Sequence, residues 1–493
     1  MERIRARFDA AAEALARETW RFRVGRVSRL DLSRVDDEFG DVTGGDLLDA
    51  ARREEGAAAF ESGRDAWRRL RHALECALLA RRTRDLEREL LEREVQERIS
   101  IAGTEAPLFA WQFGAARERD VAARRRIQDA IDAAQEGLSP LRRELFVQRG
   151  EVLASLGYAS RRAFAEAALP ELDLDAWGRR ASELLDRTEG RYQDGLRALL
   201  GDIGVEPGRA TPADEARLAL MSQFAERFPA GKRGDLVGFA TAGLGVPARA
   251  LGGIEFDLEP RRGKQPRPLC IAAQVPGEIY VSVADTGGVD SVAALLHQTG
   301  RALQLAFTSP DLPVERRRVG DPAVSELWGS MLSARIADPA WFAELIPSPA
   351  LGAFERAARH QRLARVRRVA ARVSYALELA AQPAGSDPHP FAERFADALS
   401  RATGCHYRAS GYLAGDAEPL YAVHELRAAC LEARISELLR LEFGERFWRE
   451  RRAGDLLKEL WNTGYTYTAD ELASELGVGP IDVAPLIEAI GAG

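Results

Sequence analysis

One stretch of the chain combines a histidine and a cation at the spacing of a metal site. On a helix, the sequence His-Glu-x-x-His places two imidazoles one turn apart, where they bind zinc, and the glutamate acts as general base. Here the stretch from His297 to Arg301 reads His-Gln-Thr-Gly-Arg, and a carboxylate, Glu326, follows 29 residues after the histidine. The pattern keeps one imidazole and a distant carboxylate.

The other two positions lack the chemistry that zinc hydrolysis requires. A guanidinium keeps its proton near neutral pH, so Arg301 cannot ligate a cation and repels one nearby. Gln298 can hold a water molecule but cannot take its proton, so general-base catalysis, typically worth ~10² to ~10⁴-fold, is not available there. Catalytic zinc normally has three protein ligands. We therefore expect neither bound zinc nor hydrolysis.

We hypothesise that Arg301 forms an ion pair with Glu326. Helical periodicity places Arg301 one turn after His297, and a buried carboxylate without a cationic partner is costly. The alternative is that Arg301 extends to solvent. A second start of the motif, His424-Glu425, is attributed to chance because the next ligand position is Ala428.

Composition excludes several classes of protein. The 493 residues include 76 acidic and 69 basic side chains, interspersed, with a formal net charge of -7. This balance argues against nucleic-acid binding, which normally needs a basic face or tail. No stretch approaches ~18 consecutive apolar residues, and the N-terminus has no apolar signal core. The four cysteines form no CxxC pair. We expect a cytoplasmic protein that binds neither nucleic acid nor membrane.

Helical periodicity dominates the beginning of the chain. From Arg64 to Ile99 apolar residues recur mostly at three- to four-residue steps, which predicts one long helix with a buried stripe. A second long helix is predicted from Glu105 to Glu136, ending at Gly137 before the stop signal Ser139-Pro140. We interpret residues 1–140 as an N-terminal helical lobe.

The remainder, residues 141–493, is helical except for one interval. Short segments with β-branched residues, including 269–275 and 279–283 with a turn at Pro276-Gly277, predict a small sheet. This sheet precedes the helix that carries His297. The expected order is helices over 141–210, a sheet over 252–284, motif helices over 288–337 and C-terminal helices over 350–493.

These residues resemble the zinc oligopeptidases typified by thimet oligopeptidase and oligoendopeptidase F, which carry a gluzincin motif. The matching fragments, in the family's order, are Leu153 to Tyr158, Gly253 to Asp257, the His297 helix with Glu326, Pro419 to Tyr421 and Trp461 to Gly464. The resemblance extends over residues 140 to 493, with a helical lobe before it. It implies a mainly α, two-lobed fold with a deep channel, a small β-sheet before the motif helix, and peptides of limited length as ligands.

The resemblance also assigns positions in the site. His297 and Glu326 take the places of the first and third zinc ligands, Arg301 that of the second ligand, and Gln298 that of the general base. Tyr421 takes the place of a tyrosine that assists the transition state. The resemblance therefore implies a vestigial active site made of His297, Gln298, Arg301, Glu326 and Tyr421.

We predict a catalytically inactive, oligopeptidase-like protein that binds a peptide or a protein partner in its channel and needs no cofactor. Arg261, Arg262 and Lys264 are candidates for binding a peptide carboxylate. The alternative is an unconventional zinc metallo-oligopeptidase that hydrolyses short peptides, with Zn²⁺ on His297, Glu326 and a further ligand. A third possibility is a helical scaffold whose channel is closed by side chains.

Overall fold

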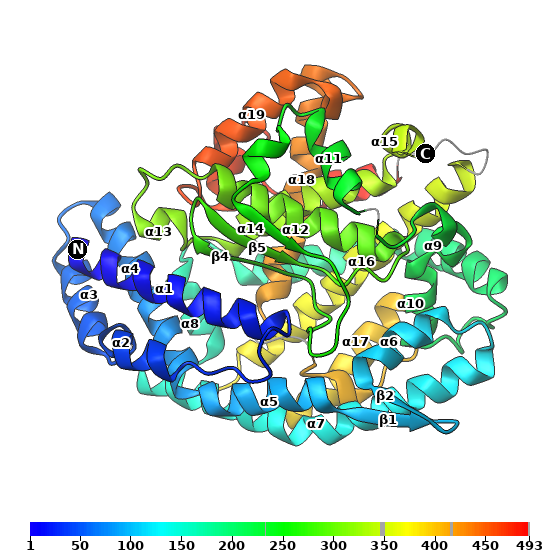
Figure 1. Ribbon diagram of the computed structural model, residues 1–493, viewed down its shortest axis with the longest axis horizontal. Helices are drawn as coiled ribbons and strands as arrows, with labels where there is room; N and C mark the ends of the chain where they lie inside the picture. Colours follow the sequence, from blue (N-terminus) through cyan, green and yellow to red (C-terminus); the bar gives the residue numbers. More distant parts are fainter. Residues whose placement is uncertain (232, 346–350, 415–417, 492–493) are drawn as a thin grey trace.

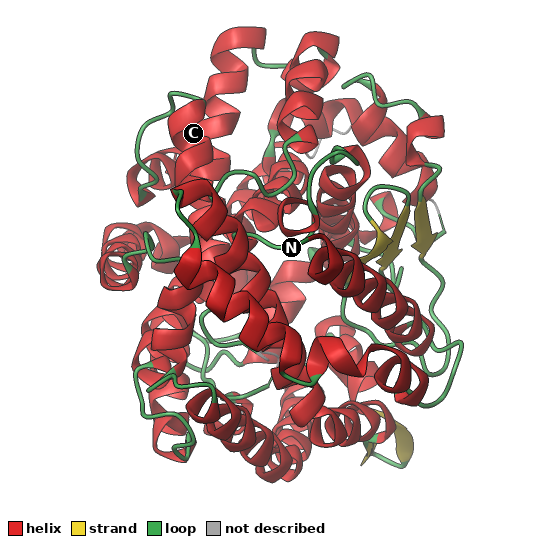
Figure 2. Cartoon of the chain, turned by 90° about the vertical axis from the view of Figure 1, so that its left-hand side faces the viewer, coloured by secondary structure: helices red, strands yellow, loops and turns green. Residues whose placement is uncertain are grey.

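The order of helices and strands follows the expectation from the sequence. The computed structural model describes residues 1–231, 233–345, 351–414 and 418–491, most of which are helical (Figures 1 and 2). Among these residues, no helix has the length and apolar character needed to cross a membrane. The fold is mainly α, with a small sheet directly before the helix that carries His297.

The first two hundred residues form helices and one hairpin, and their first part has its own core. Buried residues from Ile4 to Leu78 form a cluster that also includes Val314 from the second half of the chain. The elements are α1 (Glu2–Arg23), α2 (Ser33–Thr43), α3 (Asp46–Ala57), α4 (Glu61–Arg82), α5 (Arg84–Gln96), β1 (Arg98–Ile101), β2 (Thr104–Pro107), α6 (Leu108–Arg117), α7 (Val121–Ser155), α8 (Arg161–Ala168) and α9 (Leu174–Asp202).

Two helix expectations in this part are wrong. The helix expected from Arg64 to Ile99 is interrupted at Thr83, whose buried hydroxyl donates to the Leu79 carbonyl, and Ile99 lies in β1. The helix expected from Glu105 begins only at α7, after β2 and α6. The break at Thr83 and the β1–β2 hairpin interrupt the continuous helices that apolar periodicity predicts.

The expected helix end at Gly137 is also wrong. The 35-residue helix α7 continues through Gly137 and Pro140, because Leu138 and Leu145 on either side are buried while Pro140 faces solvent. Tertiary burial of the apolar face outweighs the local stop signal. The lobe boundary expected at residue 140 therefore falls inside one continuous helix.

The sheet before the motif helix is confirmed. Its order is β3-β5-β4, with β3 parallel and β4 antiparallel to β5. On one face Tyr280 stacks on Trp20 of α1, with ring centroids 4.8 Å apart, and on the other Ile279 and Val281 join the main core. The elements in this region are α10 (Pro212–Leu220), α11 (Arg233–Ala242), β3 (Ile254–Asp257), β4 (Leu269–Gln274) and β5 (Glu278–Ser282).

Four helices of the second half, α12, α14, α16 and α18, surround the candidate site. The motif helices and most C-terminal helices agree with the expected ranges. The elements are α12 (Val289–Phe307), α13 (Val314–Arg317), α14 (Pro322–Ser333), α15 (Pro339–Leu345), α16 (Leu351–Ala380), α17 (Ala392–Thr403), α18 (Tyr421–Phe443), α19 (Arg451–Asn462), α20 (Ala469–Glu475) and α21 (Val483–Gly491).

Candidate functional site

The structure brings His297 and Glu326 into direct contact. Their helices, α12 and α14, pack closely because Gly329 leaves room for the imidazole: a Cβ at Gly329 would lie 2.7 Å from the His297 ring. The His297 Nε2 atom is 3.0 Å from the Glu326 Oε2 atom, and both side chains are buried. The expectation that Glu326 faces the motif helix is confirmed.

Arg301 supplies the cation beside this carboxylate. Its Nη1 atom lies 3.4 Å from Glu326 Oε1, and its Nε–H donates to the Ser325 hydroxyl over 3.1 Å. The side chain of Arg301 is only 25% exposed. The hypothesised ion pair is therefore confirmed, and the alternative in which Arg301 extends to solvent is wrong.

Tyr421, at the start of α18, completes the environment of Glu326. Its hydroxyl donates to Glu326 Oε1 over 2.6 Å. Burial and the negative charge of Glu326 raise the pKa of Tyr421, so the phenol keeps its proton. Glu326 thus has three partners, His297, Tyr421 and Arg301, contributed by two neighbouring helices.

The protonation states at the centre follow from burial and these contacts. Burial opposes the charge of Glu326, but the hydrogen bond with His297 and the charge of Arg301 hold the pKa of Glu326 well below its usual range. Burial lowers the pKa of His297, and the positive charges of Arg365 and Arg301 lower it further against the effect of Glu326. At neutral pH the site holds an ionised carboxylate and a neutral imidazole that donates its Nε2–H.

Two polar atoms at the centre have no partner among the described residues. They are Nδ1 of His297 and Oε1 of Gln298, and both belong to residues that are only 7% exposed. Each is a hydrogen-bond acceptor in these protonation states. A donor group of a bound molecule or of water can satisfy them.

All five residues of the vestigial site line one cavity of about 700 Å³. Its walls come from α12, α14, α16 and α18. This cavity argues against a scaffold whose channel is closed by side chains. The charged side chains that line it among the described residues are Arg267, Asp290, Arg301, Glu326, Arg362, Arg365, Arg368, Arg372, Glu425 and Glu432.

Arg261, Arg262 and Lys264 lie outside this cavity. The Lys264 ammonium is buried and donates to the Asp257 carboxylate over 2.6 Å and to the Val283 carbonyl over 3.2 Å. Arg261 also pairs with Asp257. Two of the three cations expected to bind a peptide therefore stabilise the turn after β3, because a buried carboxylate there needs them.

The arginines of α16 are candidate functional residues that were not among those expected from the sequence. Arg362, Arg365, Arg368 and Arg372 line one wall of the cavity. Their steps of three and four residues place them on one face of the helix, and this spacing was the available signal. An arginine row is usually a solvated face, so only its position on the wall of this cavity distinguishes it.

The fold implies zinc, but the donor set does not fit this metal. His297 and Glu326 are the only two donors of the motif, and a guanidinium stands beside them. Within the described ranges, no three His, Cys, Asp or Glu side chains are grouped so that they could hold a metal ion. A protein zinc site needs three or four such donors.

Comparison with known proteins identifies the fold. No protein-family model and no curated protein matches the chain. Among solved structures, PZ peptidase A with an inhibitor has a TM-score of 0.68 at 14% identity, covering 93% of this chain and 84% of its own. A protein described as an oligoendopeptidase F from Bacillus anthracis has a TM-score of 0.69 at 14% identity, and the match covers 96% of this chain and 86% of that protein. The M32 carboxypeptidase of Deinococcus radiodurans has 0.58 at 14%, covering 99% and 97%.

The resemblance seen in the sequence is therefore confirmed at the level of fold. The chain adopts the helical fold of zinc peptidases related to oligoendopeptidase F and M32 carboxypeptidases.

Proposed function

We propose that this protein is a pseudopeptidase, which binds peptides in its channel and does not hydrolyse them. The observation that carries the proposal is the contact between Arg301 and Glu326, with 3.4 Å between the guanidinium and the carboxylate. The cation that balances this buried carboxylate belongs to the chain itself. A metal at the same carboxylate would have to overcome direct repulsion by a fixed positive charge.

The contacts of Glu326 also oppose metal binding. One carboxylate oxygen interacts with His297 and the other accepts from Tyr421. A metal ligated by both residues would break the hydrogen bond between them, and the residues that the structure describes offer no third ligand in exchange.

Water activation lacks the base of the motif as well. Gln298 cannot accept a proton, and two of the cavity carboxylates, Glu425 and Glu432, are paired with Arg372 and Arg362. These pairings support a site that retains binding without proton transfer.

The cavity itself supports ligand binding. Pockets for small ligands typically span about 300 to 1,000 Å³ and combine an apolar lining with a few directed polar groups. The cavity here, at about 700 Å³, lies within this range and is lined by Gln298, whose carbonyl oxygen is unsatisfied among the described residues. A short peptide segment has the size and the N–H donors to occupy it.

The test uses the purified full-length protein. We expect no stoichiometric zinc after dialysis against zinc-containing buffer, no cleavage of a mixed peptide library by mass spectrometry, and saturable binding of library peptides by calorimetry. Stoichiometric zinc that disappears in His297→Ala, together with cleavage, would instead support the unconventional metallo-oligopeptidase.

A double variant tests whether Gln298 and Arg301 account for the proposed loss of zinc binding. Gln298→Glu with Arg301→His restores two imidazoles one turn apart, a base and the distant carboxylate on an unchanged fold. We expect this variant to bind one zinc per chain, measured by metal analysis. Gln298→Glu with Arg301→Gln is the matched control and should bind none. Failure of the first variant to bind zinc would show that the backbone no longer has zinc-site geometry.

A further inference from the structure

The lining of the cavity carries an excess of positive charge. Among the described lining residues there are six arginines and four carboxylates. Four of the arginines lie on α16, within eleven residues of one another. The question is which of these cations is available to a ligand.

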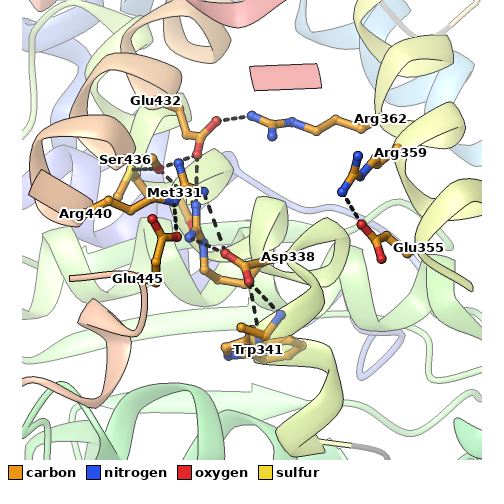
Figure 3. A network of polar contacts seen from close by, with 12 residues as sticks. Met331, Asp338, Trp341, Glu355, Arg359, Arg362, Glu432, Ser436, Arg440 and Glu445 are labelled. Atoms are coloured by element: carbon orange, nitrogen blue, oxygen red, sulfur yellow. Dashed lines mark hydrogen bonds and ion pairs between the residues drawn. The ribbon is translucent and has the colours of Figure 1, made fainter. Parts of the chain in front are cut away.

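Three of the four α16 arginines are held by carboxylates. Arg362 pairs with Glu432 of α18, as Figure 3 shows, and Arg372 pairs with Glu425 of the same helix over 2.9 Å. Arg368 pairs with Glu215 of α10. These pairs fix the wall and neutralise much of its charge.

Arg365 lies between these pairs and differs from them. It lines the cavity and is exposed. In the part of the chain that the structure describes, it makes no hydrogen bond or ion pair. Its charge nevertheless contributes to lowering the pKa of His297, so the guanidinium acts on the centre of the site.

Gln298 provides a second, independent indication of a ligand. Gln298 lines the same cavity, and its buried carbonyl oxygen has no donor among the described residues. An unsatisfied buried acceptor is costly, and a peptide N–H would satisfy it. An amide here, unlike a glutamate, also does not repel an anion.

We propose that the cavity selects peptides that carry a carboxylate, with Arg365 binding the carboxylate and Gln298 accepting a hydrogen bond from a peptide N–H. This inference rests on the proposed peptide-binding function and specifies its ligand class. The carboxylate can come from an acidic side chain or from a peptide C-terminus, and both present the same planar anion to the guanidinium.

The experiment measures binding of four versions of one pentapeptide by calorimetry in carboxylate-free buffer. The central residue is Glu or Gln, and the C-terminus is free or amidated. We expect at least one acidic version to bind about tenfold or more tightly than the Gln amide, as a charge-assisted hydrogen bond allows. Comparison of the two singly acidic versions identifies the source of the carboxylate.

Variants then assign the preference to one residue. Arg365→Gln should abolish the preference and leave the weaker binding of the neutral peptide within about twofold, while Arg365→Lys should keep part of it. Arg356→Gln, on the same helix but outside the cavity, is the charge-matched control and should change nothing.

Three outcomes would overturn the inference. If all four peptides bind wild-type protein equally, or if the preference survives in Arg365→Gln, the ligand class is wrong while peptide binding stands. If none of the peptides binds, both the inference and the proposed function fail.

Discussion

At the scale of single residues, Glu326 determines the chemistry of the site. It is a buried carboxylate that remains ionised because an imidazole, a phenol and a guanidinium surround it. Burying such a charge is tolerated only with partners of this kind. Arg301 therefore has a structural role at the place where the fold implies a metal.

Substitution of Glu326 or Tyr421 tests how much their contacts stabilise the folded protein. Glu326→Ala leaves His297 and Tyr421 without their buried partner and should lower the free energy of unfolding by about 3 kcal/mol, measured by urea titration. Tyr421→Phe removes one hydrogen bond to the charge and should cost about 1.5 kcal/mol. Glu475→Ala, an exposed position at the end of α20, is the control and should cost little.

Chelation separates this arrangement from a metal site. Because Glu326 is balanced by Arg301, EDTA should leave the melting temperature of the wild-type protein unchanged. A ligand that binds only the folded state raises its stability, so a bound metal would make the temperature fall on chelation. A drop in melting temperature that zinc reverses would contradict the proposed role of Arg301.

Single residues also show what a sequence can predict. The pair of Arg301 and Glu326 was predictable, because helical periodicity places Arg301 one turn after His297 and the resemblance to the zinc oligopeptidases places Glu326 opposite them. The proposed role of Arg365 was not, because it depends on carboxylates of α10 and α18, such as Glu215 and Glu425, that engage its neighbours. Lys264 was misassigned for the same reason: its partner Asp257 is buried by tertiary packing.

At the scale of elements, the contact between α12 and α14 positions the site. Gly300 faces the backbone of α14 so closely that a Cβ there would lie 2.0 Å from the Trp328 carbonyl oxygen. Gly329 gives the same room to the His297 ring from the other helix. Two glycines thus allow the helices to approach until His297 and Glu326 share a hydrogen bond.

Substitution of one glycine tests this packing. Gly300→Ala must separate the helices and should lower the free energy of unfolding by about 3 kcal/mol, as overpacking of a core does. Gly137→Ala, within α7, adds a Cβ that would meet no atom within 4 Å apart from its chain neighbours and the nearby backbone of its own helix, and it should instead raise the free energy of unfolding by about 0.5 to 1 kcal/mol. Urea titration of both variants measures the difference, and equal effects would refute a specific contact.

The errors at α4, α5 and α7 have a common origin at this scale. Apolar periodicity predicts the stripe that a helix buries, but it does not report where the chain breaks at Thr83 or continues past Pro140. Whether a helix breaks or continues at such a position depends on which side chains of other helices and strands pack against each turn. The sheet was predicted because its β-branched segments and Pro276-Gly277 turn are local signals.

At the scale of the whole molecule, buried histidines couple stability to pH. His360 of α16 stacks on Tyr192 of α9, with ring centroids 5.0 Å apart, and joins the two helices. Burial, with a smaller effect of Arg367, lowers the pKa of His360 to about 4. Burial likewise lowers the pKa of His72 to about 4. Both imidazoles are neutral in the folded protein near neutral pH.

The sign of the effect follows from the difference between folded and unfolded states. An unfolded histidine has a pKa of about 6.5, so between pH 6.5 and 4 the unfolded chain binds a proton at residue 360 that the folded chain does not. Stability is therefore complete above pH 6.5 and falls by up to about 1.4 kcal/mol per pH unit below it. From pH 7 to pH 5, His360 alone should remove about 2 kcal/mol.

His360→Phe tests this coupling, since it keeps an aromatic ring against Tyr192 but cannot bind a proton. We expect the variant to be about as stable as the wild type at pH 7, and to lose about 2 kcal/mol less than the wild type on going to pH 5. Urea titrations of both proteins at the two pH values measure this difference. An equal loss in both proteins would mean that the pKa of His360 in the folded state is close to its ordinary value, which would contradict this coupling.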